Sequence, residues 1–222
     1  MRRRWLGYSP KGFQRSRLNR SPLELEWGWL LLPDGGPIVR EAVVSERMGE
    51  LWEMALTRYS EMQRQLVPSV PDMVTAGVPD LTPARLPEIL NEVVERIGGP
   101  VDAVPAFEEA CERLETGRVP PSIQHDDFHT GNVFVGPDGN SEPVFFDWGD
   151  AYVGHPLSSL LIAIRVMSLD EPDPAKIRRV CDAYLRPWTD LATRSELYDH
   201  VRDAMQVAKL GRALGWTRAL SR

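Results

Sequence analysis

Hydrophobic residues recur at helical spacing along most of the chain. Between Ser45 and Leu66 the apolar positions advance in alternating steps of four and three residues, which predicts an amphipathic helix. Ser45 is its candidate N-cap, and Pro68 lies just past its end. Similar spacing predicts later helices with these inner faces: Leu86, Leu90, Val93, Val94 and Ile97; Phe107, Ala110, Cys111 and Leu114; Ile177, Val180, Cys181 and Tyr184; and Leu197, Val201, Ala204, Met205 and Ala208.

The ends of two helices are marked by proline and glycine. Thr82-Pro83 is the candidate start of the helix that contains Leu86, and Gly98-Gly99 would end it. The segment from Leu157 to Met167 is nearly all apolar and follows Pro156, so we predict a buried helix there.

Shorter apolar runs predict strands. Residues 25–32 (LEWGWLLL) form one such run, and the turn-forming residues 33–36 (PDGG) close it. Residues 133–135 and 144–146 predict two strands of a hairpin, because Pro137-Asp138-Gly139-Asn140 between them is a strong turn signal. The sequence therefore predicts an α+β chain that is mostly helical, with one small hairpin in its middle.

Charge is distributed unevenly. The 222 residues carry a net charge of −6, yet residues 1–20 contain seven basic groups and no acid. A basic segment can bind nucleic acid or an anionic membrane, but a solvated, poorly ordered leader over residues 1–24 is the simpler interpretation. The acidic remainder argues against nucleic acid as the main partner.

Cysteine usage and apolar runs indicate the compartment. Cys111 and Cys181 sit in helical patterns without CxxC spacing, which is typical of reduced, buried thiols. No apolar run approaches membrane-spanning length, and the arginine-rich start lacks the apolar stretch of a secretory signal. We therefore expect a cytoplasmic protein that has no membrane partner.

The predicted hairpin carries the candidate chemistry. Asn132 begins its first strand and Asp147 ends its second, so the two positions should lie side by side at the open end. Asp127 precedes Asn132 by five residues, on the loop that leads to the same end. Hard oxygen ligands at a site that also holds phosphates favour Mg²⁺, and a further carboxylate beside it can accept the proton of an attacking hydroxyl.

These residues also carry a family resemblance. The pattern His125-x-Asp127-x-x-x-x-Asn132 resembles the catalytic loop of kinase-like folds, and HDDFHTGNVFV is closest to the HGDLHPGNVLV form of aminoglycoside phosphotransferases. The phrase FFDWGDA, which begins at Phe145 and contains Asp147, looks like the family's counterpart of the kinase DFG segment. The chain thus resembles the aminoglycoside phosphotransferase/choline kinase family.

The resemblance implies roles for single residues. Asp127 would be the catalytic base, Asn132 and Asp147 would hold Mg²⁺, and His125 would fix the loop by packing and hydrogen bonding. Residues expected to support them nearby are Asp126, His129 and Asp150. One departure concerns the family's GDPxxDLA segment, which reads GHPLSSL here and places His155 and Ser159 at the acidic positions. Asp150 is the candidate to compensate for those acids.

The resemblance extends from about residue 25 to the end. It implies a leader over 1–24, a remnant strand and hinge of the nucleotide lobe over 25–42, and a helical catalytic lobe over 43–222. The hinge backbone that contacts the nucleotide base would be Leu31, Leu32 and Pro33. Because few residues precede this strand, we expect a truncated amino-terminal lobe, weak nucleotide binding and little turnover. A partner chain or dimer that completes the nucleotide site, or a start placed too far downstream, would also account for the short leader.

The implied fold is protein-kinase-like, and the implied activity is transfer of the γ-phosphate of ATP or GTP to a hydroxyl of a small molecule. An acidic body is compatible with a cationic acceptor. Two alternatives stay open. The chain could be a catalytically impaired pseudokinase or remnant that acts as a binding module. Alternatively, His125, Asp127 and His155 match the two-histidine, one-carboxylate pattern of non-haem iron oxygenases, although that reading requires a jelly roll.

Overall fold

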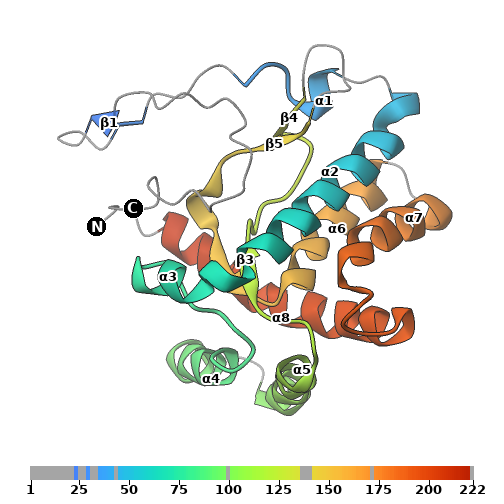
Figure 1. Ribbon diagram of the computed structural model, residues 1–222. Helices are drawn as coiled ribbons and strands as arrows, with labels where there is room; N and C mark the ends of the chain where they lie inside the picture. The colour runs from blue at the N-terminus through green and yellow to red at the C-terminus, as the bar shows by residue number, and fades with distance from the viewer. Residues whose placement is uncertain are drawn as a thin grey trace.

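A computed structural model describes residues 23–24, 29–30, 35–42, 45–98, 101–135, 142–170 and 173–220 (Figure 1). Its α-helices are α1 Val39–Ala42, α2 Ser45–Leu66, α3 Val70–Thr75, α4 Leu86–Ile97, α5 Val104–Thr116, α6 Leu160–Asp170, α7 Pro174–Leu185 and α8 Arg194–Leu220. The short 3₁₀ helices are η2 Val67–Ser69, η3 Val101–Ala103, η4 Trp148–Asp150, η5 Pro156–Ser159 and η6 Arg186–Trp188. The strands are β1 Leu23–Glu24, β2 Trp29–Leu30, β3 Ser122–Gln124, β4 Val133–Phe134, β5 Val144–Phe145 and β6 Tyr152–Gly154.

Two long helices organise the core. Helix α2 packs against α7, η6 and β3, and α8 packs against α5, η5 and α6. The inner face of α2 buries Trp52, Leu56 and Tyr59, each at most 3% exposed. Because these side chains repeat at helical spacing, one face of α2 is removed from water along its length. In Figure 1, α4 and α5 lie at the end of the molecule opposite the β4–β5 hairpin.

The described strands form antiparallel pairs. Val133 of β4 pairs with Phe145 of β5, which confirms the predicted hairpin. Strand β3 pairs with β6, with Ile123 opposite Val153. Strand β2 lies inside the predicted run 25–32 and pairs with β1, so the last two residues of the predicted irregular leader are in a strand.

The predicted helices are confirmed, with corrections to two helix starts and to one predicted core residue, and with one additional helix. Helix α4 begins at Leu86, because Thr82 to Arg85 form a turn in which the Arg85 amide donates to the Thr82 carbonyl at 2.8 Å. Its end is as predicted, since Gly98 caps it in the left-handed region with a φ of 66°. Ile97 was predicted to face the core, but it is 70% exposed. The helix predicted from Leu157 begins as the 3₁₀ turn η5 and becomes α-helical at Leu160, and α3 was not predicted.

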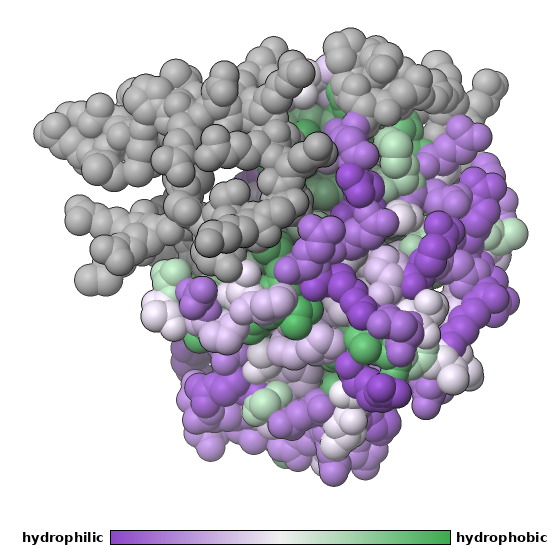
Figure 2. All heavy atoms as spheres, in the orientation of Figure 1, coloured by the Kyte–Doolittle hydropathy of each residue, from purple (hydrophilic) through white to green (hydrophobic). Residues whose placement is uncertain are grey.

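The surface and the thiols fit the composition. Figure 2 shows hydrophilic residues over most of the described part of one face, with isolated hydrophobic ones between them. Cys111 and Cys181 are buried and free, and burial raises the pKa of the two thiols to about 12 and about 11.

None of the described helices is long and apolar enough to cross a membrane. The predicted hinge at residues 31–33 and the turn at 137–140 lie outside the described residues.

Candidate active site

The candidate catalytic loop runs from β3 to β4, and buried contacts hold its first half. The Tyr59 hydroxyl of α2 accepts a hydrogen bond of 2.9 Å from the His125 amide. Phe128 is 1% exposed, and its ring lies 4.4 Å from the ring of Tyr59. Between them Asp126 has a φ of 64°, in the left-handed region that non-glycine residues rarely adopt. The loop therefore turns sharply while α2 anchors it on both sides of the turn.

His125 joins the two halves of the motif. Its ring Nε2 lies 2.6 Å from the carbonyl oxygen of Phe146, the residue before Asp147. Burial lowers the pKa of His125, while the Phe146 carbonyl and the charges of Asp127 and Asp147 oppose that shift. The imidazole is therefore near both carboxylates and ties the loop to the segment after β5. This is the contact that a loop-fixing role for His125 requires.

Asp127 and Asn132 are in direct contact. Asn132 Nδ2 donates to the Asp127 backbone carbonyl at 2.9 Å and lies 3.4 Å from the carboxylate Oδ2. The Asp127 side chain is 31% exposed, so a substrate can reach it, whereas Asn132 is buried. The arrangement places an accessible carboxylate beside a fixed amide.

Asp147 follows directly on the hairpin. The Phe146 amide donates to the Asn132 carbonyl at 3.2 Å, so the ladder continues past β4 and β5 to the residue before Asp147. The register therefore places Phe146 opposite Asn132, and Asp147 lies one residue beyond the pair that the sequence predicted. Asp147 has a φ of 62°, and its side chain is exposed.

The donors at this end of the hairpin fit a Mg²⁺ ion. Because Asn132 Nδ2 is engaged with Asp127, the amide Oδ1 is the atom left to face a cation, and the exposed Asp147 carboxylate is a second oxygen donor. Protein sites for Mg²⁺ commonly supply only one or two carboxylates and leave the other positions to phosphates and water. Two protein oxygens on neighbouring backbones meet that need.

The iron-oxygenase alternative is wrong. In the described ranges, no group of three or more His, Cys, Asp or Glu side chains could hold a metal ion, and His125, Asp127 and His155 all fall in those ranges. His155 is fully buried, which lowers its pKa to about 3. The strands that the structure describes lie in two-stranded sheets instead of a jelly roll.

The predicted supporting residues take different positions. His129 Nδ1 accepts a hydrogen bond of 2.9 Å from the Gly131 amide, and its Nε2 lies 3.3 Å from Asp127 Oδ2. Because Nδ1 is an acceptor, the ring proton is on Nε2, where it faces the carboxylate. Asp126 is buried within the loop, and Asp150 is half-buried in η4.

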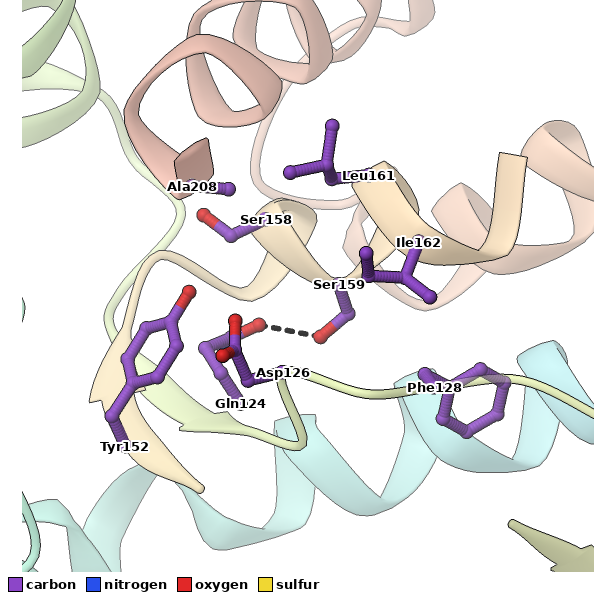
Figure 3. A pocket seen from close by; sticks show the side chains of 9 residues that line it. All are labelled: Gln124, Asp126, Phe128, Tyr152, Ser158, Ser159, Leu161, Ile162 and Ala208. Atoms are coloured by element: carbon purple, nitrogen blue, oxygen red, sulfur yellow. Dashed lines mark hydrogen bonds between the residues drawn. The ribbon is translucent and has the colours of Figure 1, made fainter. Parts of the chain in front are cut away.

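A neutral hydrogen-bond network occupies the region where the family resemblance expects acids. Ser159 Oγ donates to Gln124 Oε1 at 2.5 Å, as Figure 3 shows, and lies 3.1 Å from the Tyr59 hydroxyl. Gln63 Nε2 donates to the Ile123 carbonyl at 2.7 Å, and the Tyr184 hydroxyl donates to Gln63. The network connects η5 to β3 and to the tyrosine that holds His125, so neutral side chains link these elements.

The cavity drawn in Figure 3 lies beside this network. Its lining includes Gln124, Asp126, Tyr152 and Ser159, and its volume is about 10 Å³. That is roughly the space of one water molecule. The cavity is therefore part of the packing beneath the loop and too small for a substrate.

Sequence reasoning missed one charged residue of the site. Arg212 of α8 donates to Asp127 Oδ1 at 2.7 Å and to the Asp126 carbonyl at 2.8 Å. It lies 85 residues from Asp127 along the chain. Nothing in the local sequence distinguishes it from the other arginines of the helix.

The described fold is kinase-like and mostly helical, and the comparisons with known proteins agree. A profile of the phosphotransferase enzyme family (APH) matches residues 17–213, so the chain belongs to this family. No curated protein matches it in sequence.

Two solved structures are similar to this chain, and the first of them shows the same fold. Macrolide 2'-phosphotransferase MphH from Brachybacterium faecium, as the apoenzyme, aligns with a TM-score of 0.50 and 18% identity over 87% of this chain. The chain spans 64% of the length of that protein. A candidate aminoglycoside phosphotransferase from Ralstonia eutropha JMP134 aligns with a TM-score of 0.37 and 14% identity, over 80% of this chain and 68% of its own length.

Proposed function

We propose that this protein transfers the γ-phosphate of ATP or GTP to a hydroxyl group of a small molecule. The observation that carries the proposal is the 2.6 Å contact between His125 Nε2 and the Phe146 carbonyl. It fastens the loop that carries Asp127 and Asn132 to the segment that carries Asp147. In the proposal, a base, an amide oxygen and a second carboxylate belong to one site, because phosphoryl transfer needs this set.

In this proposal Asp127 is the general base. Its carboxylate is accessible and is held by Asn132 and Arg212, so it can orient the acceptor hydroxyl and take its proton. Asn132 Oδ1 and the Asp147 carboxylate would hold Mg²⁺, which when bound neutralises charge on the transferring phosphate. His125 keeps the two halves of the site in register. The hinge at Leu31, Leu32 and Pro33 is proposed to contact the nucleotide base.

The acceptor class follows from chemistry and from relatives. MphH is named for a macrolide, which bears hydroxyl groups, and the net charge of −6 is compatible with a cationic acceptor. We therefore propose a hydroxylated small molecule and take an aminoglycoside, a macrolide and choline as test acceptors.

The experiment follows the γ-phosphate. The purified chain is incubated with Mg²⁺, γ-labelled ATP or GTP and each acceptor, and label in the acceptor is measured. Asp147→Asn should weaken Mg²⁺-nucleotide binding, and excess Mg²⁺ should partly restore it. Asp199→Asn, on the exposed face of α8, is the matched control and should behave like the wild type.

Two outcomes would contradict the proposal. Calorimetric binding of Mg²⁺-nucleotide without transfer to any acceptor or to water would point to the binding-module alternative. Neither binding nor transfer would remove the assignment of a nucleotide site.

A further inference from the structure

Arg212 bonds both the backbone and the carboxylate of the candidate catalytic loop through a single guanidinium. Nη2 donates to Asp127 Oδ1 at 2.7 Å, and Nη1 donates to the Asp126 carbonyl at 2.8 Å. The guanidinium carbon lies 5.9 Å from the ring centre of Trp216, one turn further along α8. The Arg212 side chain is only 25% exposed, so its geometry is set by protein contacts.

The two oxygens of the Asp127 carboxylate have unequal partners. Oδ1 accepts the short, charge-assisted bond from Arg212 at 2.7 Å. Oδ2 has longer contacts, to His129 Nε2 at 3.3 Å and to Asn132 Nδ2 at 3.4 Å. Hydrogen bonds weaken as this distance grows, so Oδ2 is the less strongly engaged oxygen.

We propose that Arg212 is a positioning residue that fixes Asp127 through Oδ1 and leaves Oδ2 to accept the proton of the attacking hydroxyl. This assignment rests on the proposed function. In the step it serves, the hydroxyl O–H bond breaks and the proton moves to Asp127 Oδ2. The oxygen's electron pair forms the new bond to the γ-phosphorus, and the bond to the bridging oxygen breaks, so its electron pair leaves with the nucleoside diphosphate.

The second bond of Arg212 supports this role. Asp126 is held in the left-handed region, at a φ of 64°, where a non-glycine residue is strained and persists only when its surroundings fix it. Arg212 holds the carbonyl of this residue, and Tyr59 holds the backbone amide of His125 on the other side of the turn. The direction in which Asp127 leaves the turn is therefore set jointly by α8 and α2.

The shape of the guanidinium matters as well as its charge. A planar fork can reach a carbonyl and a carboxylate at once, whereas a lysine ammonium acts as a single point charge. Arg212→Lys should therefore keep attraction to Asp127 but lose the two-point contact, and Arg212→Met should lose both while keeping a similar apolar stem.

The experiment measures kcat and KM for Mg²⁺-ATP and Mg²⁺-GTP with the full chain, using water and the three test acceptors. Misplacing a reacting group by about 1 Å can cost on the order of 10²-fold, so Arg212→Met should lower kcat by about 10- to 100-fold with little change in nucleotide KM. Arg212→Lys should lie between it and the wild type, and added guanidinium should restore part of the kcat of Arg212→Met. Arg202→Met is the matched control, because Arg202 lies on the same helix, is 78% exposed and pairs with Asp199.

Each other outcome overturns the assignment. Full kcat in Arg212→Met would show that Asp127 is positioned without Arg212. A loss of kcat that neither lysine nor guanidinium recovers, together with a lower melting temperature, would show a purely structural tie. Wild-type protein that neither hydrolyses the nucleotide nor transfers its γ-phosphate would refute the proposed function and this inference together. If the wild type is active, the Arg212 variants test this inference alone.

Discussion

Acidification should destabilise this protein through His155. Both ring nitrogens are buried, and neither has a hydrogen-bond partner in the part of the chain that the structure describes. Burial, and then the nearby His200, lower the pKa of His155 from 6.5 to about 3. The unfolded chain therefore binds more protons than the folded protein between about pH 3 and pH 6.5, and stability is complete above this range and falls as the pH decreases.

The size of the effect follows from the same two pKa values. Between pH 7.5 and pH 5.0 a group with these values removes about 2 kcal/mol from the free energy of unfolding. His155→Leu removes the titrating ring and breaks no hydrogen bond to a described residue. The wild type should consequently lose about 2 kcal/mol more than His155→Leu over this interval.

Urea denaturation at the two pH values measures the difference directly. Leu157→Ala is the matched control, because Leu157 is fully buried in η5, the turn that begins directly after His155, and carries no titrating group. It should lower stability by about 2–5 kcal/mol equally at both pH values. Equal losses in the wild type and His155→Leu would refute the reasoning that links burial of this ring to acid sensitivity.

Two further predictions concern stability. Ser159→Ala removes the donor to Gln124 and should lower the free energy of unfolding by about 1–3 kcal/mol in urea titrations. The control Ser168→Ala, on the exposed surface of α6, should change it little. Equal effects of the two variants would argue against the network. Gly98→Ala should destabilise by about 1 kcal/mol because the residue has a φ of 66°, while Gly49→Ala inside α2 should raise stability by about 0.5–1 kcal/mol, as measured by thermal denaturation. The same sign for both glycine variants would contradict the backbone argument.

The sequence was sufficient wherever a local pattern determines the structure. Helix α2 has its predicted ends because its apolar spacing is regular and Pro68 follows it. The hairpin was predictable because turn-forming residues separate its two strands. The candidate site was predictable because Asp127, Asn132 and Asp147 lie close together in the chain, in a motif with regular spacing.

Long-range contacts have no such local pattern in the sequence. Strands β3 and β6 are three residues long and buried throughout, so they lack the alternation that marks a half-exposed strand. Gln63 is fully buried on α2 because its partners come from β3 and α7. Arg212 reaches Asp127 only because α8 folds back under the loop, and no spacing in the sequence encodes that approach.

The most direct test of the proposed mechanism compares Asp127→Asn with the wild type in γ-phosphate transfer and in nucleotide binding. Asparagine keeps the size of the side chain and can still contact Asn132 and Arg212, but it cannot accept the proton. Because the variant lacks the base that the wild type has, Asp127→Asn should lower kcat by about 10²–10⁴-fold while the affinity for Mg²⁺-nucleotide stays nearly unchanged. His129→Ala, a neighbour without an assigned chemical step, should have a far smaller effect. Full transfer by Asp127→Asn, or abolition of transfer by His129→Ala alone, would contradict the assignment of Asp127 as the base.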